Sequence, residues 1–291
     1  ETLAKAPSTP ADQSEGVLAG LGNLAEALGL TLAELLRRTE RIVHGTTVAT
    51  NALLERRGAK VAMLTTEGHR DVIEMREGLK PERYDLRLPA PEPLVPRSLR
   101  LPVRERLRAD GGVETPLDAA SLEAAIARLR EAGAEAVAVC FLHSWRDPAH
   151  EQAAAAAVAR ALPGAYVTCS AEVLPQIKEF ERFSTTAVNA YVGPAVSRYL
   201  ARLKARLEEA GYGGTLFVIL SHGGVAPVEE AARLAVGTAL SGPAGGVAAA
   251  VALARQGLGG DLVTFDMGGT STDVALVAGG EAALGRGRTV G

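Results

Sequence analysis

The strongest constraint on the fold is a continuous apolar run at residues 136–142, which lies between two helical patterns. A strand that is apolar at every position is typical of a sheet that is buried on both faces. Further strand patterns occur at 60–66 and 165–170. Asp118 and Asp147 are predicted to cap two of the helices that separate these strands. The alternation of strand and helix predicts an α/β domain with a largely parallel sheet.

A second constraint is the segment 262–277, in which two apolar strand patterns flank a turn rich in glycine and hydroxyl groups. Asp266 ends the first pattern, Asp273 opens the second, and the turn between them is Gly268, Gly269, Thr270, Ser271 and Thr272. Glycine lets backbone N–H groups approach an anion, and the three hydroxyls add donors. Two carboxylates can hold a hard cation directly or through its waters. The hairpin therefore predicts a site for a Mg²⁺-bound polyphosphate.

The alternative is that this hairpin tip is turn chemistry alone, which is the usual meaning of a Gly-Gly pair. The longer string Asp-x-Gly-Gly-Thr-x-Thr-Asp between two strands is more restrictive and favours the nucleotide interpretation. It is not a Walker P-loop, because no Gly-Lys-Ser/Thr follows. It is not a dinucleotide fingerprint either, because no helix begins at the glycines.

Other candidate site residues follow predicted strands or open a predicted helix. His44 and Thr46 follow one strand pattern and His222 follows another, and open α/β sheets bind ligands at such carboxyl ends. A core or capping role is the alternative for each of these catalytic candidates. Ser241 and Gly242 begin a predicted helix whose positive end can face a phosphate, although Ser241 can equally be the helix cap.

The remaining sequence patterns give weaker indications of a functional site. The charged string 74–80 either lines a substrate pocket or forms a solvated face. His69, His143 and His150 show no metal-ligand spacing. The chain contains neither a Gly-x-Ser-x-Gly nor a His-Glu-x-x-His motif. Activation of a substrate by phosphoryl transfer therefore fits the sequence better than direct nucleophilic attack.

Length and composition limit the class of protein. The chain has 291 residues, which suffices for two domains, and a net charge of −3, so nucleic acid is not an expected partner. No segment reaches the roughly 20 apolar residues of a membrane span. The first residues lack a signal-like pattern, so a cytoplasmic location is expected. Cys140 and Cys169 have apolar neighbours and are predicted to be buried free thiols.

Taken together, these motifs resemble the ATPase superfamily of actin, the heat-shock chaperones and the sugar kinases. More narrowly, the chain resembles the hydantoinase A / 5-oxoprolinase family, which includes N-methylhydantoinase A and the β-type subunits of acetone and acetophenone carboxylases. The strings that carry the resemblance are 44–53, 65–71, 91–97, 184–191, 240–246 and the hairpin. They span nearly the whole chain.

The resemblance implies an actin-like (ribonuclease H-like) α/β fold with two lobes. It places an N-terminal hydantoinase/oxoprolinase domain at 1–177, a bridging helical segment at 178–212 that is interrupted at Gly193-Pro194, and the start of the second lobe at 213–291. Residues 1–7 resemble the third strand of the first lobe. The first phosphate hairpin and most of the second lobe are then lacking, so we expect a fragment without turnover that binds Mg-ATP no tighter than about millimolar. Such a fragment is also expected to expose apolar surface.

The resemblance also implies the activity. It indicates a subunit of an ATP-dependent hydrolase that opens a cyclic amide of the hydantoin, N-methylhydantoin or 5-oxoproline type by phosphorylating the amide carbonyl. ATP and Mg²⁺ are the implied cofactors, with the hairpin tip, Ser241 and Gly242 at the phosphates and Asp266 and Asp273 at the metal. A hydantoinase B-type subunit is the implied partner, in an oligomer.

Two alternatives remain at this point. The first is an ATP-dependent ketone carboxylase subunit, and the strings 74–78 and 220–224 look closer to the carboxylase-like and N-methylhydantoinase-like branch than to the oxoprolinases. The second is a non-enzymatic, actin- or chaperone-like nucleotide switch. The string 44–51 resembles the hydantoinase A family and not the chaperones, which disfavours the switch.

Overall fold

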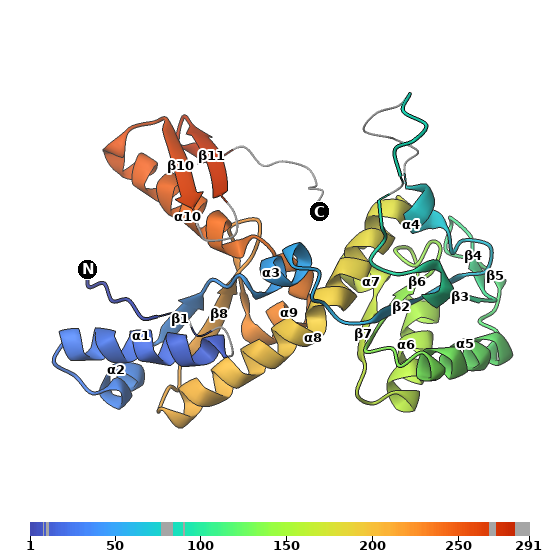
Figure 1. Cartoon of the computed structure of the whole chain (residues 1–291), viewed down its shortest axis with the longest axis horizontal. Helices are drawn as coiled ribbons and strands as arrows, with labels where there is room; N and C mark the ends of the chain where they lie inside the picture. Colours follow the sequence, from blue (N-terminus) through green and yellow to red (C-terminus); the bar gives the residue numbers. More distant parts are fainter. Residues whose placement is uncertain (8, 10–11, 77–83, 90, 268–271, 283–291) are drawn as a thin grey trace. The chain divides into compact units, whose positions relative to one another are not determined.

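The computed structural model describes residues 1–291 except 8, 10–11, 77–83, 90, 268–271 and 283–291 (Figure 1). It divides into two compact units. Unit 1 contains residues 1–57 and 195–291, and unit 2 contains residues 58–194. These units differ from the predicted division into 1–177, 178–212 and 213–291, because a strand near the start of the chain pairs with one that follows residue 195.

Unit 2 is built on a parallel sheet, as the sequence predicts. Its strands lie in the order β3-β2-β6-β7, and every neighbouring pair is parallel. The strands are β2 (Val61–Thr66), β3 (Arg100–Val103), β6 (Ala136–Cys140) and β7 (Tyr166–Cys169). All residues of β2 and β6 are buried, which explains their unbroken apolar or small character.

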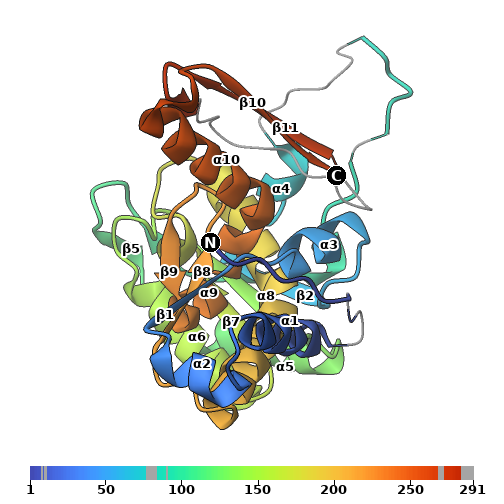
Figure 2. The ribbon, with the colours of Figure 1, turned by 90° about the vertical axis from the view of Figure 1, so that its left-hand side faces the viewer.

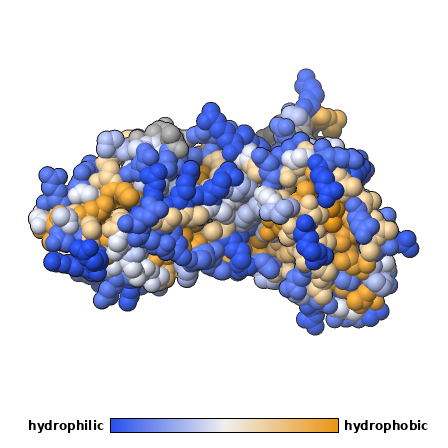
Figure 3. All heavy atoms as spheres, turned by 90° about the horizontal axis from the view of Figure 1, so that it is seen from below, coloured by the Kyte–Doolittle hydropathy of each residue, from blue (hydrophilic) through white to orange (hydrophobic). Residues whose placement is uncertain are grey.

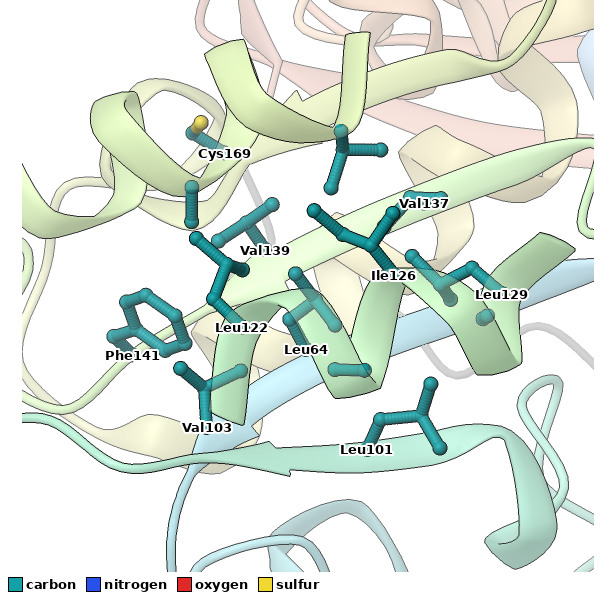
Figure 4. Packing of buried hydrophobic residues seen from close by; sticks show 14 residues of the cluster. Leu64, Leu101, Val103, Leu122, Ile126, Leu129, Val137, Val139, Phe141 and Cys169 are labelled. Atoms are coloured by element: carbon teal, nitrogen blue, oxygen red, sulfur yellow. The ribbon is translucent and has the colours of Figure 1, made fainter. Parts of the chain in front are cut away.

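The main core of unit 2 lies between this sheet and the helices α5 (Ala119–Glu131) and α6 (Ala149–Ala161). Leu122, Ala125, Ile126 and Leu129 recur at helical spacing on α5, and all four are buried. They pack against Leu64, Val137 and Val139 of the sheet (Figure 4). Asp118 caps α5 as predicted, because its side chain accepts a hydrogen bond from the Ser121 N–H at 2.8 Å.

The outer side of α6 is rich in exposed alanine. Ala153, Ala156 and Ala159 are exposed, and Figure 3 shows apolar residues at the surface of the part that contains α5 and α6. Both cysteines of the chain are free and buried in this unit, which confirms their predicted state.

The other elements of unit 2 are short. After β2 the chain forms only the single turn α4 (Val72–Met75). β3 joins the parallel sheet, whereas β4 (Arg106–Leu107) pairs with β5 (Val113–Thr115) as a separate antiparallel ladder. The remaining short elements are η1 (Arg97–Leu99) and α7 (Ser170–Val173).

The long helix α8 (Glu179–Glu209) contributes residues to both units. The predicted interruption at Gly193-Pro194 is wrong, because Pro194 lies inside this continuous helix. A side chain at Gly193 would put its Cβ 2.4 Å from the Tyr166 ring, so glycine is required for this close packing. Buried residues along α8, among them Val192 and Val196, stabilise the helix on either side of the proline.

Unit 1 contains a small mixed sheet with helices around it. In this sheet β1 (Arg41–His44) is parallel to β8 (Thr215–Ile219), which is antiparallel to β9 (Val225–Pro227). The helices before β1 are α1 (Gln13–Ala27) and α2 (Leu32–Arg38), and those that follow the strands are α3 (Val48–Leu54), α9 (Val228–Arg233) and η2 (Ala235–Thr238). α2 begins with a capping box, in which Thr31 and Glu34 exchange reciprocal hydrogen bonds.

The end of unit 1 consists of α10 (Ser241–Leu253), the π-helical turn η3 (Ala254–Leu258) and a three-stranded antiparallel sheet. Its strands β10 (Leu262–Met267) and β11 (Thr272–Ala278) form the predicted hairpin, and β12 (Glu281–Ala282) follows. One face of the hairpin exposes Val263, Phe265, Met267, Val274 and Leu276, each by at least 60%. An exposed apolar surface of this kind is what the sequence led us to expect.

The strand predicted for residues 1–7 is wrong. These residues form no strand in the structure, and the Lys5 carbonyl instead accepts a hydrogen bond from the Asn23 side-chain amide at 2.8 Å. Over the described part of the chain, no single helix is long and apolar enough to cross a membrane, and only the bent pair α1–α2 meets the length and composition requirement.

Candidate functional site

The candidate site lies in unit 1, at the edge where β1 and β8 end. Because the two strands are parallel and His44 pairs with Val218, their carboxyl ends lie at the same edge of the sheet. The loop that follows β1 leads into α3, and Figure 2 shows α10 and the β10–β11 hairpin at this side of unit 1. Such an edge is where open α/β sheets place their ligands.

Hydrogen bonds join the loop after β1 to the start of α10, although the two lie far apart in sequence. The Thr46 N–H donates to the Ser241 hydroxyl oxygen at 3.4 Å, and that hydroxyl donates to the Thr46 carbonyl at 2.9 Å. The Leu240 N–H donates to the Thr50 hydroxyl at 2.8 Å. Ser241 is fully buried. These contacts fix the start of α10 against the strand end.

The role of Ser241 as a helix cap is wrong. The N-cap position is occupied by Leu240, which has a φ of 60° and makes no side-chain capping bond. The Ser241 hydroxyl is used instead to hold Thr46. The first turn of α10 therefore has no side-chain cap, and its amides remain available to a ligand.

Gly242 leaves open space at this helix start. A Cβ added there would meet no atom within 4 Å, so the backbone is accessible to a bound group. α10 has 13 residues, long enough for its aligned peptide dipoles to favour negative charge at this end. This geometry is compatible with the predicted position of Ser241 and Gly242 near a phosphate. The side chain of Ser241 would contribute indirectly, because its hydroxyl is hydrogen-bonded to the backbone of Thr46.

His44 is held by a tyrosine. The Tyr199 hydroxyl lies 2.7 Å from His44 Nε2, and the two rings are tilted by 49°. Burial lowers the pKa of His44 from 6.5 to about 4, and burial raises the pKa of Tyr199 to about 12. Both side chains are therefore neutral at neutral pH. The tyrosine then donates to Nε2, which leaves the proton of the imidazole on Nδ1.

We expect His44 to titrate near pH 4 and to make the stability of unit 1 depend on pH. The pKa of the folded state, about 4, lies below the ordinary 6.5. Between these values the unfolded chain binds a proton that the folded chain does not, so stability falls as the pH is lowered through this range. The full loss is at most about 3 kcal/mol.

Two measurements check this prediction. Heteronuclear NMR of the imidazole reports the His44 pKa directly, and urea unfolding at pH 7 and pH 4.5 reports the change in stability. The variant His44→Gln should show a smaller loss between the two pH values than the original chain. A midpoint near 6.5 for His44 would contradict the expected burial.

His222 is placed less favourably. It lies in the turn between β8 and β9 at the same edge of the sheet, but its side chain is exposed. Its Nδ1 accepts a hydrogen bond from the Gly224 N–H at 3.2 Å, within its own turn. The described part of the chain contains no hydrogen bond between His222 and His44. The catalytic roles of His44, Thr46 and His222 remain predictions.

The predicted metal residues face each other across the hairpin. Asp266 of β10 is the register partner of Asp273 of β11, and Thr272 is opposite Met267. The alternation of the strands puts both carboxylates on the same face as Val277, which is fully buried, and α10 contacts both strands. The two carboxylates therefore lie on the α10 side of the hairpin.

β10 contacts α10 and runs along it in Figure 1. Asp266, near the end of β10, is exposed. The tip residues Gly268, Gly269, Thr270 and Ser271 lie outside the described residues, so their predicted role stays a prediction.

Two carboxylates with neighbouring hydroxyl and amide donors suit a hydrated Mg²⁺ ion that carries phosphates. The described residues contain no cluster of three or more His, Cys, Asp or Glu side chains that could hold a metal ion. A cation at Asp266 and Asp273 would accordingly take its remaining ligands from water and a bound phosphate, which is how Mg²⁺ is usually held in phosphate sites.

Two residues of this site were missed by the sequence reasoning. Neither Tyr199 nor Thr50 was singled out from the sequence. A buried tyrosine needs a partner for its hydroxyl, but the sequence does not say which one. The partner, His44, lies 155 positions earlier, and no local pattern connects them.

Comparisons with known proteins identify the family of the chain. Residues 2–162 match the family model for the hydantoinase/oxoprolinase N-terminal region, and residues 182–289 match the hydantoinase/oxoprolinase model. The caprolactamase subunit alpha of Pseudomonas jessenii is 44% identical over 280 residues, which are 96% of this chain and 40% of that protein. The acetophenone carboxylase gamma subunit of Aromatoleum aromaticum is 34% identical over 288 residues, which are 94% of this chain and 39% of that protein.

Solved structures show the same relationship. The crystal structure of the ATP-dependent caprolactamase from Pseudomonas jessenii matches with a TM-score of 0.81 at 44% identity, over 93% of this chain and 40% of that one. The nucleotide-free structure of acetone carboxylase matches with a TM-score of 0.87 at 29% identity, over 96% of this chain and 41% of that one. The chain thus spans about 40% of the length of these relatives, and the expected α/β fold is confirmed. The chain belongs to the hydantoinase/oxoprolinase family.

Proposed function

We propose that the protein is part of an ATP-dependent hydrolase that opens a cyclic amide by phosphorylating its carbonyl oxygen. The observation that carries the proposal is the pair Asp266–Asp273, register partners on the α10 side of the hairpin, in the same unit as the open start of α10. The 44% identity to a caprolactamase subunit favours an amide as the substrate.

The hairpin and α10 would bind the nucleotide. Asp266 and Asp273 would hold Mg²⁺ through its waters, and the first amides of α10, at Ser241 and Gly242, would face a phosphate. When bound, ATP would supply the phosphoryl group that converts the amide oxygen into a leaving group, with Mg²⁺ offsetting the charge. Thr46 would act as a positioning residue, because both of its backbone groups bond to Ser241.

His44 would orient the substrate as a neutral hydrogen-bond donor. Its Nε2 accepts from Tyr199, and its lowered pKa keeps the ring neutral at physiological pH. The N–H at Nδ1 can then donate a hydrogen bond to a carbonyl oxygen of the substrate. A proton held by a group with a pKa of about 4 would be lost at neutral pH, so His44 is not a suitable general acid.

A second subunit is part of the proposal. The caprolactamase relative is named as an alpha subunit, and the carboxylase relatives are named as gamma and beta subunits. We infer a partner of the hydantoinase B type for this protein as well, within an oligomer. Co-purification with that partner would be the first condition for measuring activity.

The test is an assay of phosphate release from Mg-ATP with a panel of substrates. It uses the chain with whatever further sequence its gene encodes, together with the partner subunit. The panel is caprolactam, hydantoin, N-methylhydantoin and 5-oxoproline on one side, and acetone and acetophenone with bicarbonate on the other. Phosphate release that depends on a cyclic amide is the expected result.

The other outcomes identify the alternatives. Phosphate release that depends on a ketone and bicarbonate would replace the hydrolase by a carboxylase. ATP hydrolysis that no substrate stimulates would favour a nucleotide switch. Either result would overturn the proposed reaction.

A further inference from the structure

Unit 2 contains an open pocket of about 490 Å³ that the proposed function does not use. It lies beyond the carboxyl ends of two parallel strands, since His69 follows β2, and Leu142 and His143 follow β6. Arg76 follows α4, Lys178 directly precedes α8, and Phe180 lies in the first turn of α8. In a parallel sheet this is the edge at which ligands bind.

The backbone around this pocket is unusual. Five non-glycine residues of the described chain have positive φ, and three of them, Arg76, His143 and Lys178, line the pocket. Arg76 has a φ of 55° and a ψ of −143°, close to a region that is almost restricted to glycine. Such conformations cost free energy and gather at binding sites, so this concentration at one pocket points to a ligand.

Arg76 is the positively charged side chain in this pocket that can pair with a bound anion. Its guanidinium carbon lies 5.8 Å from the centre of the Phe180 ring, which holds it in a cation–π contact. No ion pair of Arg76 is found among the described residues. Lys178, by contrast, is paired with Glu181 at 3.2 Å. The pocket therefore presents one positioned guanidinium, which binds a carboxylate through two parallel hydrogen bonds.

His69 also lines the pocket, and two contacts hold its ring. Its Nδ1 lies 3.1 Å from the Glu67 carbonyl oxygen, and its Nε2 lies 3.4 Å from Arg106 Nη1.

The other lining residues limit the charge and the polarity of an anion that could bind here. Val72, Leu142 and Phe180 give the pocket apolar walls. Glu179 and Glu181 also line it, and their negative charges disfavour a multiply charged anion such as phosphate. A singly charged group on an apolar chain suits both features.

We propose that this pocket binds a small organic carboxylate with an apolar chain. The carboxylate pairs with the Arg76 guanidinium, and the chain lies against Leu142 and Phe180. All of its lining residues belong to unit 2, whereas the proposed nucleotide site is built from residues of unit 1. The proposal does not depend on which reaction the family site performs.

The test is a titration of the 291-residue chain with hexanoate, followed by two-dimensional NMR of the backbone amides. Saturable shifts confined to the pocket residues are expected. Hexylamine, which has the same chain and the opposite charge, should produce no such shifts. Arg76→Gln should weaken hexanoate binding by about tenfold or more, the loss of one charge-assisted pair, and Arg76→Lys by less.

A control variant and two further comparisons show whether binding depends on Arg76 and on the charge of the ligand. Arg128→Gln changes an exposed arginine on α5 of the same unit, and hexanoate should bind this variant as it binds the original chain. Equal binding of hexanoate and hexylamine by the original chain would overturn the proposal whether or not the variants fold. Unchanged affinity in Arg76→Gln, or tighter binding of inorganic phosphate than of hexanoate, would overturn it as well.

Discussion

Replacing Arg182 by methionine is expected to lower the free energy of unfolding of unit 2 by about 3–5 kcal/mol. The side chain is fully buried. Its guanidinium donates to the Ser170 hydroxyl at 3.1 Å, the Gln176 carbonyl at 2.8 Å and the Phe141 carbonyl at 3.1 Å. Methionine fills a similar volume but donates to none of these groups, so they remain buried without that donor.

The loss is expected to be large because Arg182 belongs to a network with Glu151. That carboxylate is also fully buried and accepts from the Phe141 N–H at 2.8 Å, the Ser170 hydroxyl at 2.7 Å and the Ala171 N–H at 2.8 Å. Burial raises the pKa of Glu151, against the hydrogen bonds, which lower it. Removing the nearby guanidinium takes away a charge that stabilises the ionised carboxylate.

Urea unfolding followed by tryptophan fluorescence measures this effect in unit 2. The chain has a single tryptophan, Trp145, and it lies in that unit. Arg128→Met, a matched change on the exposed side of α5, should alter stability by no more than about 0.5 kcal/mol. A change of less than 1 kcal/mol in Arg182→Met would show that the network contributes little.

A double-variant cycle separates the pair from its parts. Glu151→Leu is expected to be strongly destabilising, because it leaves the Arg182 guanidinium buried without its carboxylate. The combined variant Glu151→Leu/Arg182→Met should lose less than the sum of the two single changes. Strict additivity would mean that the two side chains act independently.

The parallel sheet of unit 2 was predictable because its signals are local. A strand buried on both faces must be apolar along its length, and 136–140 shows this in the sequence itself. The cap at Asp118 and the capping box at Thr31 each involve residues within three positions. The β10–β11 hairpin is also local, because its register partners lie at most 15 positions apart. Such patterns need no knowledge of the rest of the chain.

The differences between the structure and the sequence-based expectations concern features that depend on distant partners. β1 pairs with β8, more than 170 positions later, so no local pattern shows that residues 1–57 fold with 195–291. The hydroxyl of Ser241 bonds to Thr46, which lies 195 positions away, and capping was the only role visible from its neighbours. Pro194 is a helix breaker by local chemistry, yet packing on both sides keeps α8 continuous.

Replacing Asp266 by asparagine is expected to lower ATP-driven turnover about a hundredfold or more, if the proposed metal role is right. Asparagine keeps the size of the side chain and one oxygen ligand but removes the charge. Asp266 and Asp273 are register partners, so the change also leaves a single carboxylate opposite an amide. A Mg²⁺ ion with its phosphates would then lose half of the negative charge that the hairpin offers.

The same substitution should leave the fold at least as stable as before. Like charges directly opposite one another in an antiparallel pair repel, and removing one of them relieves that repulsion by up to about 1 kcal/mol. A residue kept only for the structure of the hairpin would show the opposite result, with lower stability and unchanged turnover. The combination of lost activity and retained stability is therefore specific to a metal-binding role.

The assay compares Asp266→Asn with Glu281→Gln, which neutralises an exposed carboxylate in β12 of the same sheet. Phosphate release is measured across a range of Mg²⁺ concentrations, and thermal unfolding is measured in parallel. Glu281→Gln should match the original protein in both, whereas Asp266→Asn should require more Mg²⁺ and still turn over slowly at saturation. Full turnover by Asp266→Asn at ordinary Mg²⁺ would exclude Asp266 from the metal site and leave the hairpin carboxylates without an assigned role.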